Sequence, residues 1–173
     1  HNYRADQINN KELQALKGNS RFYKAEVTGK FPEYMYPTHA ELELKVGAQV
    51  MFIKNDSSPE KRYFNGKIGE IVALDKQQIV VSCPGDSSNI VTVPETWENI
   101  RYTVDKKNKT IIDEGIGSFK QMPLRLAWAI TIHKSQGLTF DKIVIDADDA
   151  FAHGQSYVAL SRCRTLEGIV LTK

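Results

Sequence analysis

The chain has 173 residues, of which 41% are hydrophobic and 25% are charged. This composition suits one good core, or a core plus a small satellite unit, and excludes a largely disordered chain. The formal net charge of +2 is almost balanced, so charge alone does not indicate nucleic-acid binding. Cys83 and Cys163 lie far apart and outside any CxxC pattern. Their placement argues against a metal site and against a disulfide-stapled secreted fold. No apolar run approaches the roughly 20 residues of a membrane span.

The first third of the chain predicts one helix and at least two strands. Asp6 can cap a helix that extends to about residue 16, because apolar residues recur there at roughly helical spacing. After a break of Gly, Asn and Ser, residues 22–27 have the pattern of a strand. Residues 49–53 form a stronger strand candidate that is apolar on both faces.

The middle of the chain has a different pattern of apolar and polar residues. Short apolar runs at 68–74, 79–81 and 90–93 are separated by polar, turn-rich segments, and a further pair flanks the lysine-rich stretch 106–109. That stretch is most simply a solvated hairpin turn, with attraction to DNA as the lesser alternative. Short strands at this spacing are typical of a small antiparallel barrel. We therefore expect a β-barrel over residues 62–120.

From Pro123 onward the pattern indicates an α/β fold. A buried-type strand at 142–146, a helix at 155–163 and an apolar run at 169–171 fit a βαβ unit in a parallel sheet. The predicted organisation is an α/β domain built from residues 1–61 and 121–173, into which the barrel is inserted. Both ends of the sequence are abrupt, and we expect them to be the boundaries of a piece of a longer chain.

Residues 131–140 carry one candidate for chemistry. An apolar run leads directly into hydroxyl, imidazole, ammonium, amide and glycine groups. Hydroxyls, lysine and backbone N–H groups at the end of an element suit phosphate oxygens, and Gly137 lets the backbone approach a ligand closely. The alternative is a strand-to-helix turn with a polar cap, which is a common structure.

Residues 157–164 carry the second candidate. A helix with inward apolar residues ends in Ser-Arg-Cys-Arg. Arginines at a helix C-terminus often only complement the helix dipole. The functional alternative is a positive fork that reaches a phosphate across a cleft, a role that suits the permanent charge and bidentate geometry of Arg162.

The two segments resemble a known family. Residues 129–138 resemble motif V, and residues 157–164 resemble motif VI, of the superfamily 1B helicases. Residues 44–51 and 63–69 are similar to the PIF-type branch of that group, which is related to the RecD-like enzymes, and residues 2–9 resemble the end of motif IV. The resemblance spans nearly the whole chain.

The resemblance implies an architecture and a cofactor. In such helicases two RecA-like domains sandwich ATP, and single-stranded DNA runs across both. This chain would supply the second RecA-like domain with an inserted SH3-like barrel. The phosphate loop GxxxxGK[ST] and a convincing Asp-Glu site for Mg²⁺ are missing from the sequence. We therefore expect ATP and Mg²⁺ to be bound mainly by an N-terminal domain, and the fragment alone to be inactive.

The resemblance also implies roles for single residues on the nucleotide side. Arg162 matches the motif VI arginine that reaches the γ-phosphate of ATP, and Gln136 and Gly137 match motif V positions near the nucleotide. Several relatives place an acidic residue near the position of Thr139, where it meets the ribose. This sequence departs from them there, which weakens the expectation of a sugar contact.

The DNA side is predicted in two places. The motif V segment supplies backbone contacts from Thr131, His133, Lys134 and Ser135, and Asn2 and Asn9 help from motif IV. The competing role is ordering of the loop for His133 and a solvated surface charge for Lys134. In the barrel, Tyr63, Phe64 and Lys67 are predicted to contact DNA by stacking and charge. The alternative is that Tyr63 and Phe64 pack the barrel against its parent domain.

The function implied is that of the C-terminal motor portion of an ATP-dependent DNA helicase that translocates 5′ to 3′ on single-stranded DNA and unwinds duplex. The expected partners are single-stranded DNA, junctions of single-stranded and duplex DNA, and the N-terminal RecA-like domain of the same protein; no membrane is expected, and the fragment is expected to be monomeric. The expected process is DNA repair and recombination. The expected compartment is the bacterial cytoplasm, and the alternative for a eukaryotic protein is the nucleus or the mitochondrion. The alternative is a non-catalytic nucleic-acid-binding module that retains helicase folds.

Overall fold

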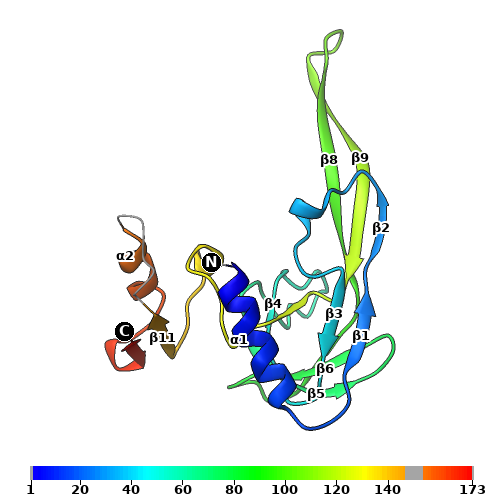
Figure 1. The fold of residues 1–173 in the computed structure, drawn as a ribbon. Helices are drawn as coiled ribbons and strands as arrows, with labels where there is room; N and C mark the ends of the chain where they lie inside the picture. The colour runs from blue at the N-terminus through cyan, green and yellow to red at the C-terminus, as the bar shows by residue number, and fades with distance from the viewer. Residues whose placement is uncertain (1, 147–153, 173) are drawn as a thin grey trace. The chain divides into compact units, whose positions relative to one another are not determined.

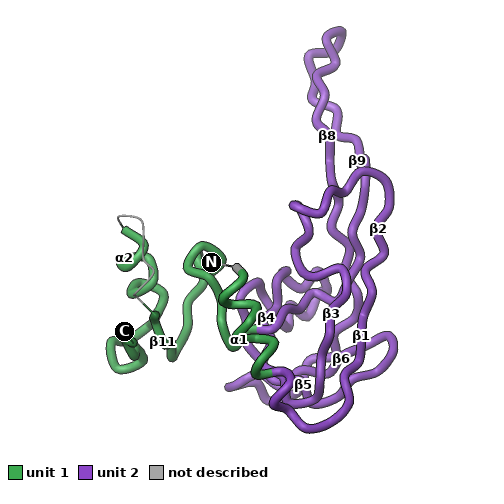
Figure 2. The backbone as a smooth tube through the Cα atoms, in the orientation of Figure 1, with its two compact units in different colours: residues 1–12, 127–173 green, residues 13–126 purple. Residues whose placement is uncertain are grey.

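The structure is a computed structural model that describes residues 2–146 and 154–172. It is a mixed α/β fold with several sheets. Two compact units share the chain, one formed by residues 1–12 and 127–173 and the other by residues 13–126 (Figure 2). Among the described helices, none is long and apolar enough to cross a membrane.

The main sheet of residues 13–126 is antiparallel and has five strands in the order β10-β4-β5-β6-β7. These strands are β4 (Gln49–Phe52), β5 (Ile68–Leu74), β6 (Ile79–Ser82), β7 (Ile90–Thr92) and β10 (Leu124–Leu126). Buried side chains alternate along β5, β6 and β7, whereas β4 is buried on both faces, as its apolar sequence predicts. They build the core of the unit, with Val50, Phe52, Ile71, Val81 and Leu124 among its fully buried members.

The sheet does not confirm that the predicted barrel closes. In the described part of the chain, β10 and β7 form the two edges, and no ladder joins them. The antiparallel strands expected of the barrel are present, and its closure stays a prediction. Two strands of the sheet, β4 and β10, come from outside residues 62–120.

The predicted strand over residues 22–27 is two short strands. β1 (Arg21–Lys24) pairs with β3 (Glu41–Leu44), whereas β2 (Glu26–Gly29) pairs with β9 (Thr110–Gln121). The change of partner occurs at Ala25, whose N–H donates to the carbonyl of Ala40 at 2.7 Å. One extended segment thus contributes to two sheets.

A long hairpin formed by β8 (Glu95–Asp105) and β9 is paired from Glu95↔Gln121 to Asp105↔Thr110. The third strand, β2, covers only residues 117–120 of β9, so the hairpin continues beyond it as two strands (Figure 1). Gly117 permits the close packing where the third strand ends, because a Cβ there would lie 2.3 Å from the carbonyl oxygen of Lys30. Aromatic rings pack at this base, with Phe119 between Tyr36 and Trp97 at centroid distances of 4.7 and 6.1 Å.

The loop between β4 and β5 is organised around one buried carboxylate. The side chain of Asp56 is 3% exposed and accepts the backbone N–H groups of Ser58 and Arg62, each at 2.9 Å, and the Arg62 side chain at 3.3 Å. Burial raises the pKa of Asp56, but the hydrogen bonds from Ser58 and Arg62 outweigh it and lower the pKa to about 2. The charged form therefore stabilises the loop.

Replacing Asp56 with Asn should destabilise the protein in a pH-dependent way. The pKa falls from 3.8 to about 2 on folding, and at 1.36 kcal/mol per unit the charged form contributes about 2 kcal/mol. Because the folded pKa is the lower one, this contribution is present above pH ~4 and is lost as the pH falls toward 2. Urea unfolding of Asp56→Asn is measured from pH 7 to pH 2.5. The gap in free energy of unfolding between the variant and the wild type should shrink as the pH falls. The exposed Asp113→Asn serves as control, and a gap independent of pH would contradict the assignment.

The described parts of residues 1–12 and 127–173 contain the α/β elements. α1 (Asn2–Ala15) begins here, and β11 (Ile143–Asp146), α2 (Gln155–Leu160) and β12 (Ile169–Thr172) follow. β11 and β12 pair in parallel, from Ile143↔Ile169 to Asp146↔Thr172. The predicted strand–helix–strand unit with parallel strands is therefore confirmed.

Candidate functional site

The two segments predicted to carry chemistry lie side by side within one compact unit. Phe140 N–H donates to the Arg162 carbonyl at 2.8 Å, and Arg164 N–H donates to the Phe140 carbonyl at 3.0 Å. These bonds form a parallel β-bridge between Phe140 and Cys163. The end of the first segment is thus joined to the end of α2, although 22 or more residues separate them along the chain.

Gly168 keeps the two segments close at the next turn. The Cys163 thiol donates to the carbonyl of Asp141 at 3.3 Å. A Cβ on Gly168 would lie 2.1 Å from the same carbonyl oxygen and 2.7 Å from the Cys163 sulfur. Only a residue without a side chain fits between them. We call this junction of Phe140 and Asp141 with Cys163 and Gly168 the joint.

Arg162 lies across this joint. Its Nε donates to the Val158 carbonyl at 3.1 Å, its Nη1 to the Leu138 carbonyl at 3.5 Å and its Nη2 to the Ser161 hydroxyl at 3.1 Å. All three acceptors are neutral, and no carboxylate in the described chain forms an ion pair with this guanidinium. Arg162 is half-buried, so its positive charge is held in place and is available to an anion.

Arg164 has a different environment. It is exposed, and its Nη1 lies 3.4 Å from Asp141 Oδ1, with both side chains more than half exposed. An exposed pair of this kind contributes little to stability. The two arginines of the Ser-Arg-Cys-Arg sequence therefore differ in their partners. Arg162 has neutral acceptors, whereas Arg164 pairs with a carboxylate.

The loop before Gly137 is a short 3₁₀ turn, His133–Ser135. Thr131 begins it: its hydroxyl accepts the Lys134 N–H at 3.4 Å, and its carbonyl accepts the Ser135 N–H at 3.1 Å. The Ser135 hydroxyl is buried and donates to the Ile132 carbonyl at 2.6 Å. Both hydroxyls thus help to shape the loop, the Ser135 hydroxyl as a donor and the Thr131 hydroxyl as an acceptor, which fits the polar-cap interpretation. His133 and Lys134 are the side chains that the loop exposes.

Gln136 and Gly137 follow on the exposed side of the loop. Gly137 has a φ of +77°, a conformation that favours glycine. No atom lies within 4 Å of the position that its Cβ would take. A ligand can therefore approach the backbone at this point without a side chain in the way.

α1 supports this site through Asn9, which the resemblance to motif IV made a candidate for contact with DNA. Asn9 is buried, and its side chain makes two hydrogen bonds with Ala129: the amide donates to the carbonyl at 2.9 Å and the side-chain oxygen accepts the N–H at 2.8 Å. Arg4 forms an ion pair of 2.7 Å with Asp146 at the end of β11. The helix thus holds the segment that leads into the loop. The side chain of Asn2, a predicted DNA contact, lies outside the described residues.

Replacing Asn9 with Ala should destabilise the segment that leads into the loop. The change leaves the N–H and carbonyl of the half-buried Ala129 without their partner, at a cost of about 1 kcal/mol, the low end of the range for unsatisfied groups. Urea unfolding should show this loss, while Asn10→Ala, an exposed neighbour on the same helix, should be nearly neutral. Equal stabilities of the two variants would show that Asn9 does not anchor the segment.

The second place where DNA contacts are predicted, around Tyr63 and Lys67, lies in residues 13–126. Tyr63 is buried, its ring stacks on Phe52 with centroids 4.2 Å apart, and its hydroxyl lies 3.4 Å from Glu95. Burial, followed by the charges of Glu95 and Asp56, raises the pKa of Tyr63 to about 12. This geometry favours the packing role for Tyr63. Lys67 pairs with Asp86 at 2.8 Å and lies 5.8 Å from the exposed ring of Phe64.

Comparison with known proteins places this architecture. Residues 126–170 match the family described as the UvrD-like helicase C-terminal domain. ATP-dependent DNA helicase Pif1 of Psychrobacter sp. is 35% identical over 99% of this chain and 33% of its own length. The structure is similar to unliganded Pif1 from Bacteroides sp., with a TM-score of 0.89, 47% identity and coverage of 99% of this chain and 38% of that one. The structure is also similar to Pif1 from Bacteroides in complex with ADP-AlF3 and ssDNA. The TM-score is 0.76 and the identity 46%, with coverage of 100% of this chain and 39% of that one.

The joined segments and the fold define the chain as the C-terminal portion of a superfamily 1 helicase. It spans about a third of the length of the first curated relative that it matches. Within that superfamily the chain belongs to the PIF-type branch of group 1B.

Proposed function

We propose that this chain is the C-terminal motor portion of an ATP-dependent DNA helicase that translocates 5′ to 3′ on single-stranded DNA and unwinds duplex. The observation that carries the proposal is the position of Arg162, held by neutral acceptors from α2 and from the loop at Leu138. Two further facts support it: a matched relative is named an ATP-dependent DNA helicase, and a similar structure is described with ADP-AlF3 and ssDNA.

On the nucleotide side, Arg162 is the proposed arginine finger. A permanent charge near the γ-phosphate stabilises the charge of the transferring phosphoryl group. Gln136 and the open backbone at Gly137 lie on the same loop as the carbonyl of Leu138, which accepts from Arg162, so they are the proposed neighbours of the nucleotide. ATP and Mg²⁺ are held mainly by the N-terminal RecA-like domain in this proposal.

On the DNA side, the exposed His133 and Lys134 are the proposed contacts to the backbone, with Thr131 and Ser135 shaping their loop. Asn2 stays a proposed contact from motif IV. Lys67 is the proposed contact from the sheet region, with the exposed ring of Phe64 in place of the buried Tyr63. Such contacts are blind to sequence, as translocation requires.

The proposed domain organisation assigns residues 1–61 and 121–173 to the second RecA-like domain and residues 62–120 to an inserted SH3-like barrel. Single-stranded DNA, junctions with duplex and the N-terminal RecA-like domain of the same protein are its proposed partners. The proposed setting is a monomer acting in DNA repair and recombination in the bacterial cytoplasm. The alternative function is a non-catalytic nucleic-acid-binding module.

The test uses the full-length protein. ATP hydrolysis is measured with and without single-stranded DNA, and unwinding is measured on duplexes with either a 5′ or a 3′ single-stranded tail. The proposal predicts hydrolysis stimulated by DNA, and unwinding of the substrate with the 5′ tail. Binding of single-stranded DNA without any hydrolysis would favour the non-catalytic alternative.

A further inference from the structure

The end of the β8–β9 hairpin is a second concentration of positive charge. The four residues of its turn, 106–109, contain three lysines and no acid. The stem next to the turn is different, because Arg101 lies opposite Glu114 in the register and Tyr102 opposite Asp113. Across the register the basic Arg101 of the stem faces Glu114, whereas the three lysines belong to a turn that contains no acidic residue.

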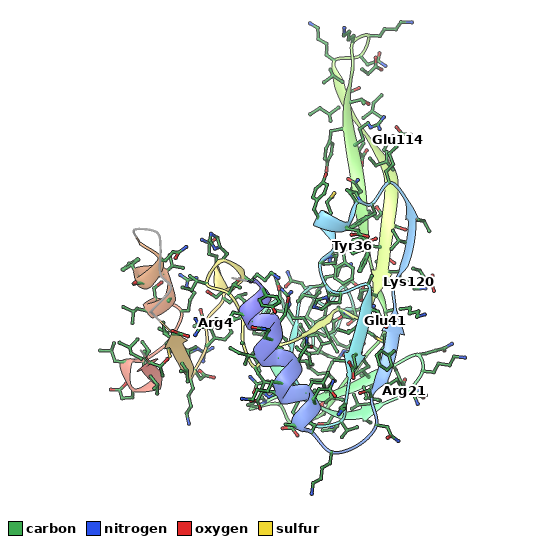
Figure 3. All side chains as sticks on the ribbon, in the orientation of Figure 1. Arg4, Arg21, Tyr36, Glu41, Glu114 and Lys120 are labelled. Carbon is green, nitrogen blue, oxygen red and sulfur yellow. The ribbon has the colours of Figure 1, made fainter. Side chains whose placement is uncertain are left out.

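The geometry of the hairpin keeps this charge away from the rest of its unit. β2 stops at Gly29, opposite Gly117, and the paired residues beyond, from Ile100↔Gly115 to Asp105↔Thr110, have no third strand. Figure 3 shows Glu114 on this two-stranded part of β9, and Lys120 on the part that lies beside β2. The tip is therefore carried out into solvent.

The turn itself is ordered by its own hydrogen bonds. The Asp105 carboxylate accepts the Lys107 N–H at 2.8 Å and the Asn108 side-chain amide at 2.9 Å. Lys109 has a φ of +54°, a conformation in which glycine or asparagine is more usual. The carboxylate is thus engaged inside the turn, and within the described chain Lys106, Lys107 and Lys109 form no ion pair.

We propose that Lys106, Lys107 and Lys109 form a contact site for the phosphate backbone of DNA, separate from the site around Arg162. The inference rests on the proposed function, because it assumes that the protein works on DNA. Three exposed ammonium groups on a turn of four residues present positive potential to a phosphate chain without requiring any base sequence. The exposed stem face of Ile100, Tyr102, Val104 and Ile111 is the rival feature, since an apolar face suits a protein partner.

The test replaces the three lysines with Gln in the full-length protein. Binding of single-stranded DNA and of blunt duplex is measured from low to moderate salt. Each lost phosphate contact lowers the slope of log K against log salt by about 0.9 for duplex and about 0.7 for a single strand. The proposal predicts a slope shallower by about two to three and binding roughly tenfold weaker at low salt for at least one DNA form, which identifies the form that the tip contacts.

A matched control removes the same number of charges elsewhere. Lys11→Gln, Lys17→Gln and Lys76→Gln change exposed lysines outside the hairpin and should leave the slope close to that of the wild type. Unchanged slopes for both DNA forms in the tip variant, with the wild type binding DNA, would overturn this inference and leave the proposed function standing. A wild type that binds neither form would overturn both. Unchanged DNA binding together with altered self-association of Tyr102→Ser/Ile111→Ser would assign the hairpin to a protein partner instead.

Discussion

Replacing Arg162 with Ala should lower DNA-stimulated ATP hydrolysis by about 10³- to 10⁵-fold, the range found where arginine fingers are removed. The half-buried guanidinium has three neutral acceptors and no carboxylate partner in the described residues, so its charge is not neutralised by an ion pair. The loss should fall on kcat, because the charge is needed most when the γ-phosphoryl group moves. Steady-state hydrolysis at saturating DNA measures it.

Two variants sharpen this test. Arg162→Lys keeps the charge but cannot reach several acceptors with a planar fork, so it should recover only part of the activity. Arg164→Ala removes the neighbouring arginine, whose exposed pair with Asp141 contributes little, and should retain hydrolysis within tenfold. Near-wild-type kcat in Arg162→Ala, with single-stranded DNA still bound, would rule out the arginine-finger role.

The sequence anticipated features that depend on local pattern. The parallel pairing of β11 with β12 followed from a strand–helix–strand order, which leaves few alternatives for the chain. Arg162 was singled out by the resemblance of residues 157–164 to motif VI, because the helix end alone left complementation of the helix dipole as an equal alternative. By contrast, the split of residues 21–29 into β1 and β2 depends on which strands arrive on either side of Ala25. Propensity carries no information about such partners.

The candidate site shows the same division between local and long-range features. Thr131 and Ser135 have hydroxyls of the kind that bind phosphate, yet both are engaged within their own turn. Asn9 was expected to help contact DNA from motif IV, and its buried pairing with Ala129 could not be foreseen, because that partner is 120 residues away. Tyr63 and Phe64 are adjacent aromatics, and only the packing against Phe52 decides which one is exposed.

Replacing Gly168 with Ala should damage both stability and activity. The new Cβ would lie 2.1 Å from the Asp141 carbonyl oxygen, which is backbone and cannot rotate away. Relief requires a shift of the chain next to Phe140, whose backbone is bonded to Arg162 and Arg164. Overpacking of this kind costs about 1–3 kcal/mol. A displacement of about 1 Å at a catalytic group can reduce kcat on the order of 10²-fold.

Gly115→Ala is the matched control, because nothing lies within 4 Å of the Cβ that it would add and its φ is not positive. It should unfold in urea like the wild type and keep full DNA-stimulated hydrolysis. The Gly168→Ala variant is also assayed well below its unfolding midpoint, so that a lower kcat reports displacement of Arg162 and not loss of folded protein. If Gly168→Ala unfolds at a lower urea concentration yet hydrolyses ATP at the wild-type rate, the joint stabilises the fold without positioning Arg162. If it matches Gly115→Ala in both measurements, the close approach of Gly168 to Asp141 is not a constraint on the molecule.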